Sequence, residues 1–87
     1  MYKTDQEKKQ IMTKQELNRD IKRLANNHHS MEEADVKNEI KRLYYADSTF
    51  EYMNLNSVKM LLRLNLRYRV ISLHVFGLHI DLPNELN

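Results

Sequence analysis

Two capping boxes near the start of the chain constrain its fold more than any other feature. In a capping box, a Ser or Thr hydroxyl and a Glu side chain three residues later bond two backbone amides that a helix start otherwise leaves unpaired. Thr13 forms one such pair with Glu16, and Ser30 forms another with Glu33. We therefore expect two helices joined by a short turn, an αα-hairpin over residues 13–47.

The apolar residues that follow each box recur at helical spacing and mark the buried side of each helix. In the first helix these are Leu17, Ile21, Leu24, Ala25 and His28. In the second they are Val36, Ile40, Leu43 and Tyr44. Asn26 and Asn27 disfavour a helix interior, which agrees with a break between the two helices.

The second half of the chain gives a mixed pattern. Leucine spacing predicts a third helix near residues 55–65, whereas residues 62–70 alternate apolar and polar side chains as a strand does. Helix and strand both stay open for residues 62–70, and we favour a helix that gives way to a strand. The alternation then changes phase at Phe76 and Gly77, which predicts a bulge or turn. The expected fold class is mainly α (α+β): the αα-hairpin, a third helix, and a short C-terminal extended segment or β-hairpin.

Length limits how the chain can be stabilised. Its 87 residues suit one small domain, here residues 12–87, and the charged and amide residues before it predict a flexible tail over residues 1–11. The sequence has no cysteine, so no disulfide or thiolate zinc site can support the core. No stretch approaches the roughly 20 apolar residues of a membrane span. We expect a cytoplasmic protein with no membrane partner, and the Leu-rich third element is a candidate homodimer contact.

Four basic residues stand in a window free of acidic ones. The window spans residues 54–80, contains no Asp or Glu, and holds Lys59, Arg63, Arg67 and Arg69. On a helix the first three recur every fourth residue, and on a strand the three arginines point the same way, so either structure presents a shared basic face. With Tyr68 beside them, these residues are the predicted binding site.

A shared row of arginines can bind either phosphates or carboxylates. The alternative is that the row is only the solvated side of an amphipathic element. Tyrosines near it, Tyr45, Tyr52 and Tyr68, could also stack on bases, although core packing accounts for most aromatic residues in the chain. Only four cations lie on the face, and the carboxylates of the first two helices would repel a long phosphate track, so a protein partner is favoured over nucleic acid.

Catalytic chemistry has little support in the sequence. The four histidines lack the helical spacing of metalloprotease ligands. The best case for an enzyme is a trio of His74, His79 and Asp81, which a phase change at Gly77 would bring to one face. It has no recognisable nucleophile, phosphate-binding loop or carboxylate pair. We expect no enzyme activity, no catalytic residues, no cofactor and no metal.

Three segments of the chain carry a family resemblance: MTKQELNRDIKRL from Met12, LLRLNLRYRV from Leu61 and FGLHI from Phe76. The chain resembles the small accessory proteins of staphylococcal temperate phages. The resemblance implies a non-enzymatic protein that binds and modulates, mainly by inhibition, a host or rival macromolecule such as a replication factor, a repressor or a defence nuclease. A small nucleic-acid-binding regulatory protein is the alternative.

Overall fold

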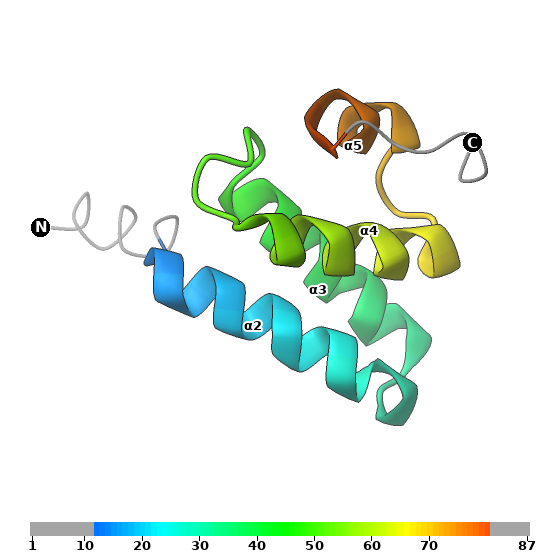
Figure 1. Ribbon diagram of the computed structural model, residues 1–87. Coiled ribbons are helices and arrows are strands. Elements are labelled where there is room, and N and C mark those ends of the chain that lie inside the picture. The colour runs from blue at the N-terminus through cyan, green and yellow to red at the C-terminus, as the bar shows by residue number, and fades with distance from the viewer. Residues whose placement is uncertain (1–11, 81–87) are drawn as a thin grey trace, which may run out of the picture.

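The computed structural model describes residues 12–80, and these residues form a mainly helical fold (Figure 1). The α-helices are α2 (Lys14–Asn27), α3 (Glu33–Ala46), α4 (Leu55–Tyr68) and α5 (Leu73–Ile80), and the 3-10 turn η1 (His28–Ser30) joins α2 to α3. The predicted tail over residues 1–11 lies outside the described residues. Over the described part, the prediction of a mainly α protein is confirmed.

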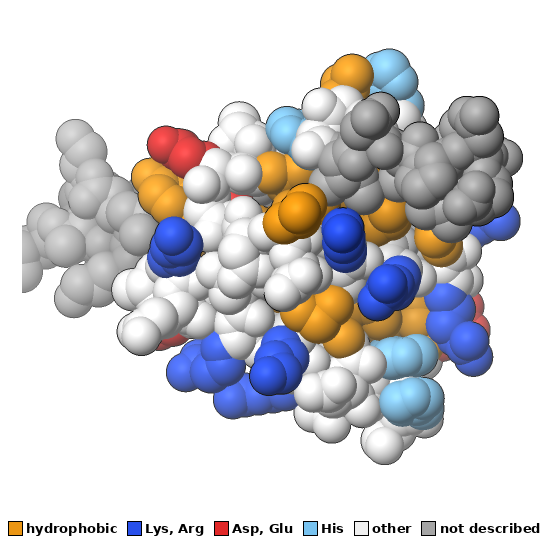
Figure 2. Space-filling model, viewed as in Figure 1, with side chains coloured by type: hydrophobic (Ala, Val, Ile, Leu, Met, Phe, Trp, Pro, Cys, Tyr) orange, Lys and Arg blue, Asp and Glu red, His pale blue; other side chains and the backbone are white. Residues whose placement is uncertain are grey.

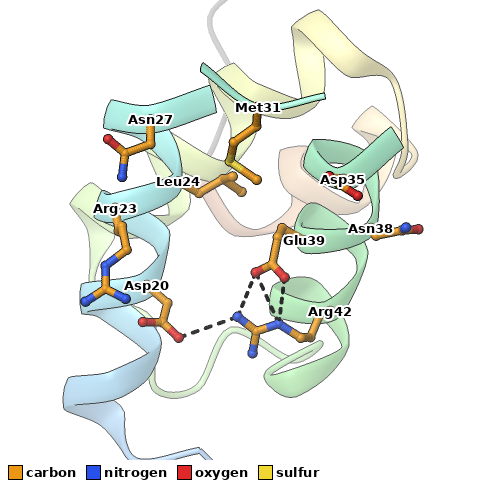
Figure 3. Close-up of a pocket in the computed structure, with 9 residues that line it drawn as sticks. All are labelled: Asp20, Arg23, Leu24, Asn27, Met31, Asp35, Asn38, Glu39 and Arg42. Atoms are coloured by element: carbon orange, nitrogen blue, oxygen red, sulfur yellow. Dashed lines mark hydrogen bonds and ion pairs between the residues drawn. The ribbon is translucent and has the colours of Figure 1, made fainter. Parts of the chain in front are cut away.

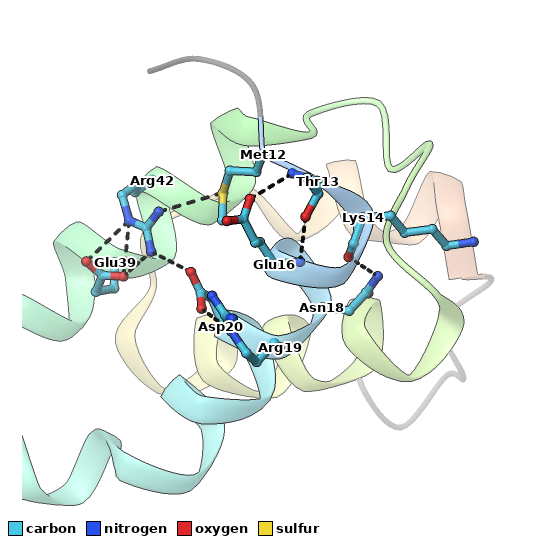
Figure 4. A network of polar contacts seen from close by, with 9 residues as sticks. All are labelled: Met12, Thr13, Lys14, Glu16, Asn18, Arg19, Asp20, Glu39 and Arg42. Atoms are coloured by element: carbon cyan, nitrogen blue, oxygen red, sulfur yellow. Dashed lines mark hydrogen bonds and ion pairs between the residues drawn. The ribbon is translucent and has the colours of Figure 1, made fainter. Parts of the chain in front are cut away.

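Helix α2 begins as the sequence predicts. The Thr13 hydroxyl accepts a hydrogen bond of 3.0 Å from the Glu16 amide, and the Glu16 carboxylate accepts one of 3.1 Å from the Thr13 amide (Figure 4). These two bonds complete the capping box. The expected apolar stripe is buried at Leu17, Ile21 and Leu24, and it faces both α3 and α4.

Helix α3 begins two residues later than predicted. The predicted box at Ser30 and Glu33 does not form, because the N-cap of α3 is Glu32 and its side chain makes no capping bond. Ser30 instead ends η1, where the Met31 amide donates to the His28 carbonyl. The acidic Glu33 and Asp35 in the first turn still complement the helix dipole. The αα-hairpin itself forms as predicted, with its stripe buried at Val36, Ile40 and Leu43.

Helix α4 is the centre of the fold, since it packs against α2, α3 and α5. It continues to Tyr68, so the favoured change to a strand near residue 65 is wrong. The alternating apolar positions were compatible with a helix because Leu61, Leu62 and Leu64 all fall on its broad buried side. Asn54 caps its start by accepting a 2.8 Å hydrogen bond from the Ser57 amide.

The connection between α3 and α4 is organised by one buried carboxylate. Asp47 accepts hydrogen bonds of 2.8 to 2.9 Å from the amides of Glu51, Tyr52 and Met53. Phe50 adopts a left-handed backbone with φ of 57°. Asp47 thereby satisfies three amides of an irregular segment, which fixes where α4 begins.

The expected extended segment or β-hairpin after residue 70 is wrong for the described residues, because Leu73–Ile80 forms α5. Phe76 is fully buried, and its ring packs against those of Tyr44 and Phe50. Gly77 has no positive φ, so the predicted bulge is absent. Ahead of α5, Asn65 accepts from the amides of Val70 and Ile71 and donates to the Ile71 carbonyl.

Substitution of Phe76 tests the position of α5. Phe76 has no exposed surface, whereas Leu78 on the same helix is 70% exposed. We expect Phe76→Ala to lower the free energy of unfolding by about 3 to 5 kcal/mol. The matched control Leu78→Ala should change it by less than about 0.5 kcal/mol. Urea unfolding followed by circular dichroism measures both, and equal effects would contradict the packing of α5.

Candidate functional site

The basic residues of α4 lie together on its exposed side. Lys59, Arg63 and Arg67 are all exposed and follow one another at one-turn intervals. Val58, Leu61 and Leu62 are buried on the opposite side. A helix rises 1.5 Å per residue, so the three cations extend over about 12 Å along α4. The structure therefore brings three of the five predicted site residues onto one face.

The other two predicted residues have different surroundings. Arg69 follows the end of α4 in a left-handed conformation, φ 58°, and its side chain donates to the Leu66 carbonyl. Tyr68 is half-buried, and its hydroxyl lies 2.9 Å from Nδ1 of His28. The two rings meet edge to face, with 5.7 Å between centroids. Tyr68 is thus a contact to η1 rather than an open aromatic surface.

Helix α2 adds a cation that the sequence analysis left out. Lys22 lines a hollow of about 560 Å³ between α2 and α4, together with Lys59 and Arg63. The remaining lining residues are neutral: Asn18, Asn54, Asn56, Ser57 and Met60. The sequence does hold a signal for the α2 side of this hollow. Asn18, Lys22 and Asn26 recur every fourth residue beside the apolar stripe of α2, so they share one side of that helix.

A second hollow, of about 450 Å³, continues the first along the same two helices. Both share Arg63 and Met60. The second hollow is otherwise lined by Ala25, Asn26, His28, Leu64 and Arg67. We call the two hollows together the α2–α4 seam. No Asp or Glu of the described residues lines either hollow. In Figure 2 the acidic side chains that are coloured appear at the margin of this face, while Lys and Arg are spread across it.

The cations of the seam take part in none of the ion pairs formed among the described residues. Those pairs join Arg19 and Arg42 to Asp20, Arg42 to Glu39, and Lys37 to Glu33. Lys22, Lys59, Arg63 and Arg67 are absent from this set. Within residues 12–80, the positive charge of the seam is therefore not neutralised by carboxylates.

The hollow on the other side of α2 differs from the seam because carboxylates line it. It has a volume of about 570 Å³ and lies between α2 and α3, where Arg42 bonds Glu39 at 2.7 Å and reaches Asp20 at 3.5 Å (Figure 3). The hydrogen bonds to Glu39 raise the pKa of Arg42 despite its partial burial, and those to Asp20 add to the effect. Asp35 also lines this hollow. Its lining holds three carboxylates, Asp20, Asp35 and Glu39, against two arginines, Arg23 and Arg42, so it has no comparable attraction for an anion.

Asn18 of α2 connects this helix to the start of α4 by hydrogen bonds at one end of the seam. Its Oδ1 accepts hydrogen bonds from the Asn54 amide and the Ser57 hydroxyl, at the start of α4. Its amide nitrogen donates to the carbonyls of Lys14 and Tyr52. One side chain of α2 thereby joins this helix to the first turn of α4.

His28 lies at the far end of the seam. Its ring stacks on that of His29 at 4.2 Å and contacts the Tyr68 hydroxyl. Partial burial lowers the pKa of His28 below 6.5, and the charges of His29 and Arg67 lower it further. The effect of Arg67 agrees with the geometry, since Arg67 and His28 line the same hollow.

The histidine trio considered for catalysis does not form over the described residues. His74 and His79 lie on α5 five positions apart, which places them on different sides of a helix. Asp81 lies outside the described residues. Among residues 12–80, no three His, Asp or Glu side chains lie close enough together to hold a metal ion.

None of the described helices combines the length and apolar character needed to cross a bilayer. No family model, no curated protein and no solved structure matches this chain.

The lowered pKa of His28 predicts a pH-dependent stability. The unfolded chain binds the proton more readily than the folded protein, so this contribution is complete above pH 6.5 and is lost as the pH falls towards the folded pKa. In urea unfolding, we expect His28→Gln to reduce the loss of stability between pH 7.5 and pH 5.5. His74→Gln, at an exposed position on α5, serves as the control. An unchanged pH dependence in His28→Gln would contradict this role.

Proposed function

We propose that this protein is a non-enzymatic binding protein that acts in the cytoplasm and inhibits or redirects a host or rival macromolecule. The target is an acidic protein surface, in keeping with the phage accessory proteins that the sequence resembles. The observation that carries the proposal is the α2–α4 seam: four cations from two helices that share no ion pair with the described carboxylates.

A protein target is favoured over nucleic acid by the surroundings of Tyr68. Its hydroxyl contacts His28, and the Arg67 guanidinium lies 6.0 Å from the centre of its ring. Tyr68 is thus engaged by His28 and Arg67, and the more exposed Tyr45 and Tyr52 line neither hollow of the seam, whereas single-strand binding proteins place stacking aromatic rings beside their cations. Asp20 and Glu39 line the hollow on the other side of α2, so a long phosphate track that crossed both the seam and α2 would meet carboxylates.

Charge reversal tests the seam. We expect the double variant Arg63→Glu, Arg67→Glu to capture at least about tenfold less of its target from a nuclease-treated cell lysate, since the seam would then repel an acidic surface. The control, Lys14→Glu with Lys41→Glu, changes the net charge equally at exposed positions outside the seam. It should leave capture unchanged. An equal loss in both variants would refute the seam as the contact.

The nucleic-acid alternative makes a different prediction. If the four seam cations each neutralised a phosphate, the logarithm of affinity for a 20-nucleotide single strand would fall with the logarithm of salt concentration with a slope of about −3. We expect binding to this probe to be weak, and capture of the target to survive nuclease treatment. A slope of that size, combined with loss of capture after nuclease, would replace the protein target with nucleic acid.

A further inference from the structure

The second hollow of the seam places donors on both of its walls. Arg63 and Arg67 come from α4, and Asn26 and His28 come from the end of α2 and from η1. Two guanidinium groups can supply up to five N–H donors each, and the Asn26 amide supplies two more. Among residues 12–80, no Asp or Glu lines the hollow. The described site can therefore offer many hydrogen-bond donors to an oxyanion without a carboxylate of these residues to repel it.

The His28 ring is held in place by its neighbours. Tyr68 contacts Nδ1 at 2.9 Å, and the His29 ring stacks on the imidazole. When the Tyr68 hydroxyl donates to neutral Nδ1, the ring proton lies on Nε2. A proton on both nitrogens adds a full positive charge beside Arg67. His28 can thus respond to an anion by taking up a proton.

We propose that this hollow binds a dianionic phosphate monoester group, which the partner presents to Arg63, Arg67 and His28. The two arginines carry a charge of +2, which one phosphate monoester balances, whereas a single carboxylate or a phosphodiester balances half of it. Arginine also pairs with phosphate oxygens in a bidentate manner. This inference rests on the proposed binding function and specifies the chemical group that the seam recognises.

The charged and titratable groups of the described residues that line the two hollows at His28 enter the expected pH response. From α4 these are Arg63, Arg67 and the Tyr68 hydroxyl; from η1 there is His29; and from α3 there is Glu33, which lines the adjoining hollow of His28 and Tyr68 and is paired with Lys37 at 3.1 Å. In the free protein, partial burial and then the charges of His29 and Arg67 lower the pKa of His28. A bound dianion reverses that field, so the pKa of His28 should rise on binding.

The first experiment uses small probes on the purified protein. Phenyl phosphate and dimethyl phosphate are titrated separately at pH 7.5, with the His28 ring signals followed by NMR. We expect phenyl phosphate to bind at least about tenfold more tightly than the diester, and Arg67→Gln to weaken it about tenfold, the effect of losing one charged hydrogen-bonding partner. Lys41→Gln should bind as the unsubstituted protein does. Equal binding of both probes, or an equal loss in both variants, would overturn the site.

The second experiment measures proton uptake. Sulfate stays a dianion between pH 5 and pH 8, so it reports on His28 without titrating itself. At constant ionic strength, we expect sulfate to raise the pKa of His28 by about half a unit to one unit, which corresponds to a three- to tenfold gain in affinity when His28 is protonated. An unchanged pKa would overturn the inference. If the probes fail while capture of the target still depends on Arg63 and Arg67, only the phosphate site is removed and the binding function stands.

Discussion

The burial of one side of α4 by three other helices is the constraint on which the rest of the structure depends. Val58, Leu61 and Leu62 occupy the buried side, and Leu64 is also buried and lines the second hollow with Ala25 of α2. With 3.6 residues per turn, side chains every fourth residue from Lys59 must then lie on the remaining arc. The exposure of the three cations is therefore a consequence of core packing.

Buried polar side chains fix the irregular segments around this core. Asp47 binds three amides before α4, and Asn65 binds the segment after it. A buried polar atom without a partner would cost about 1 to 3 kcal/mol, and the described residues contain no such side-chain atom. These anchors define both ends of α4 and so the length of the face that carries the cations.

The elements that the sequence predicted best are those whose signals are local. The box at Thr13 and the apolar stripes of α2 and α3 involve residues within a few positions of one another, and the structure shows both. Helix α5 was missed because its residues are mostly apolar or β-branched, so two different periods fit them. What decides its form is the distant contact of Phe76 with Tyr44 and Phe50.

For the binding site, too, the sequence predicted the local features and missed those that depend on distant contacts. The shared face of Lys59, Arg63 and Arg67 followed from spacing alone, because it depends only on the period of one helix. The contribution of Lys22 and the contact of Tyr68 with His28 depend on how α2 and η1 lie against α4. A single sequence holds no local signal for such a pairing, since the residues involved are about 40 positions apart.

The two sides of α2 differ in how their cations are paired. On the side towards α3, Arg42 is held by Glu39 and Asp20, so its charge supports the packing of the hairpin (Figures 3 and 4). On the side towards α4, no described carboxylate pairs with the seam cations, although four acidic residues lie on α3 and its start. Exposed cations contribute little to folding. Their grouping on one face, apart from these acids, therefore adds little to stability, and the proposed binding of an anionic partner rests on it.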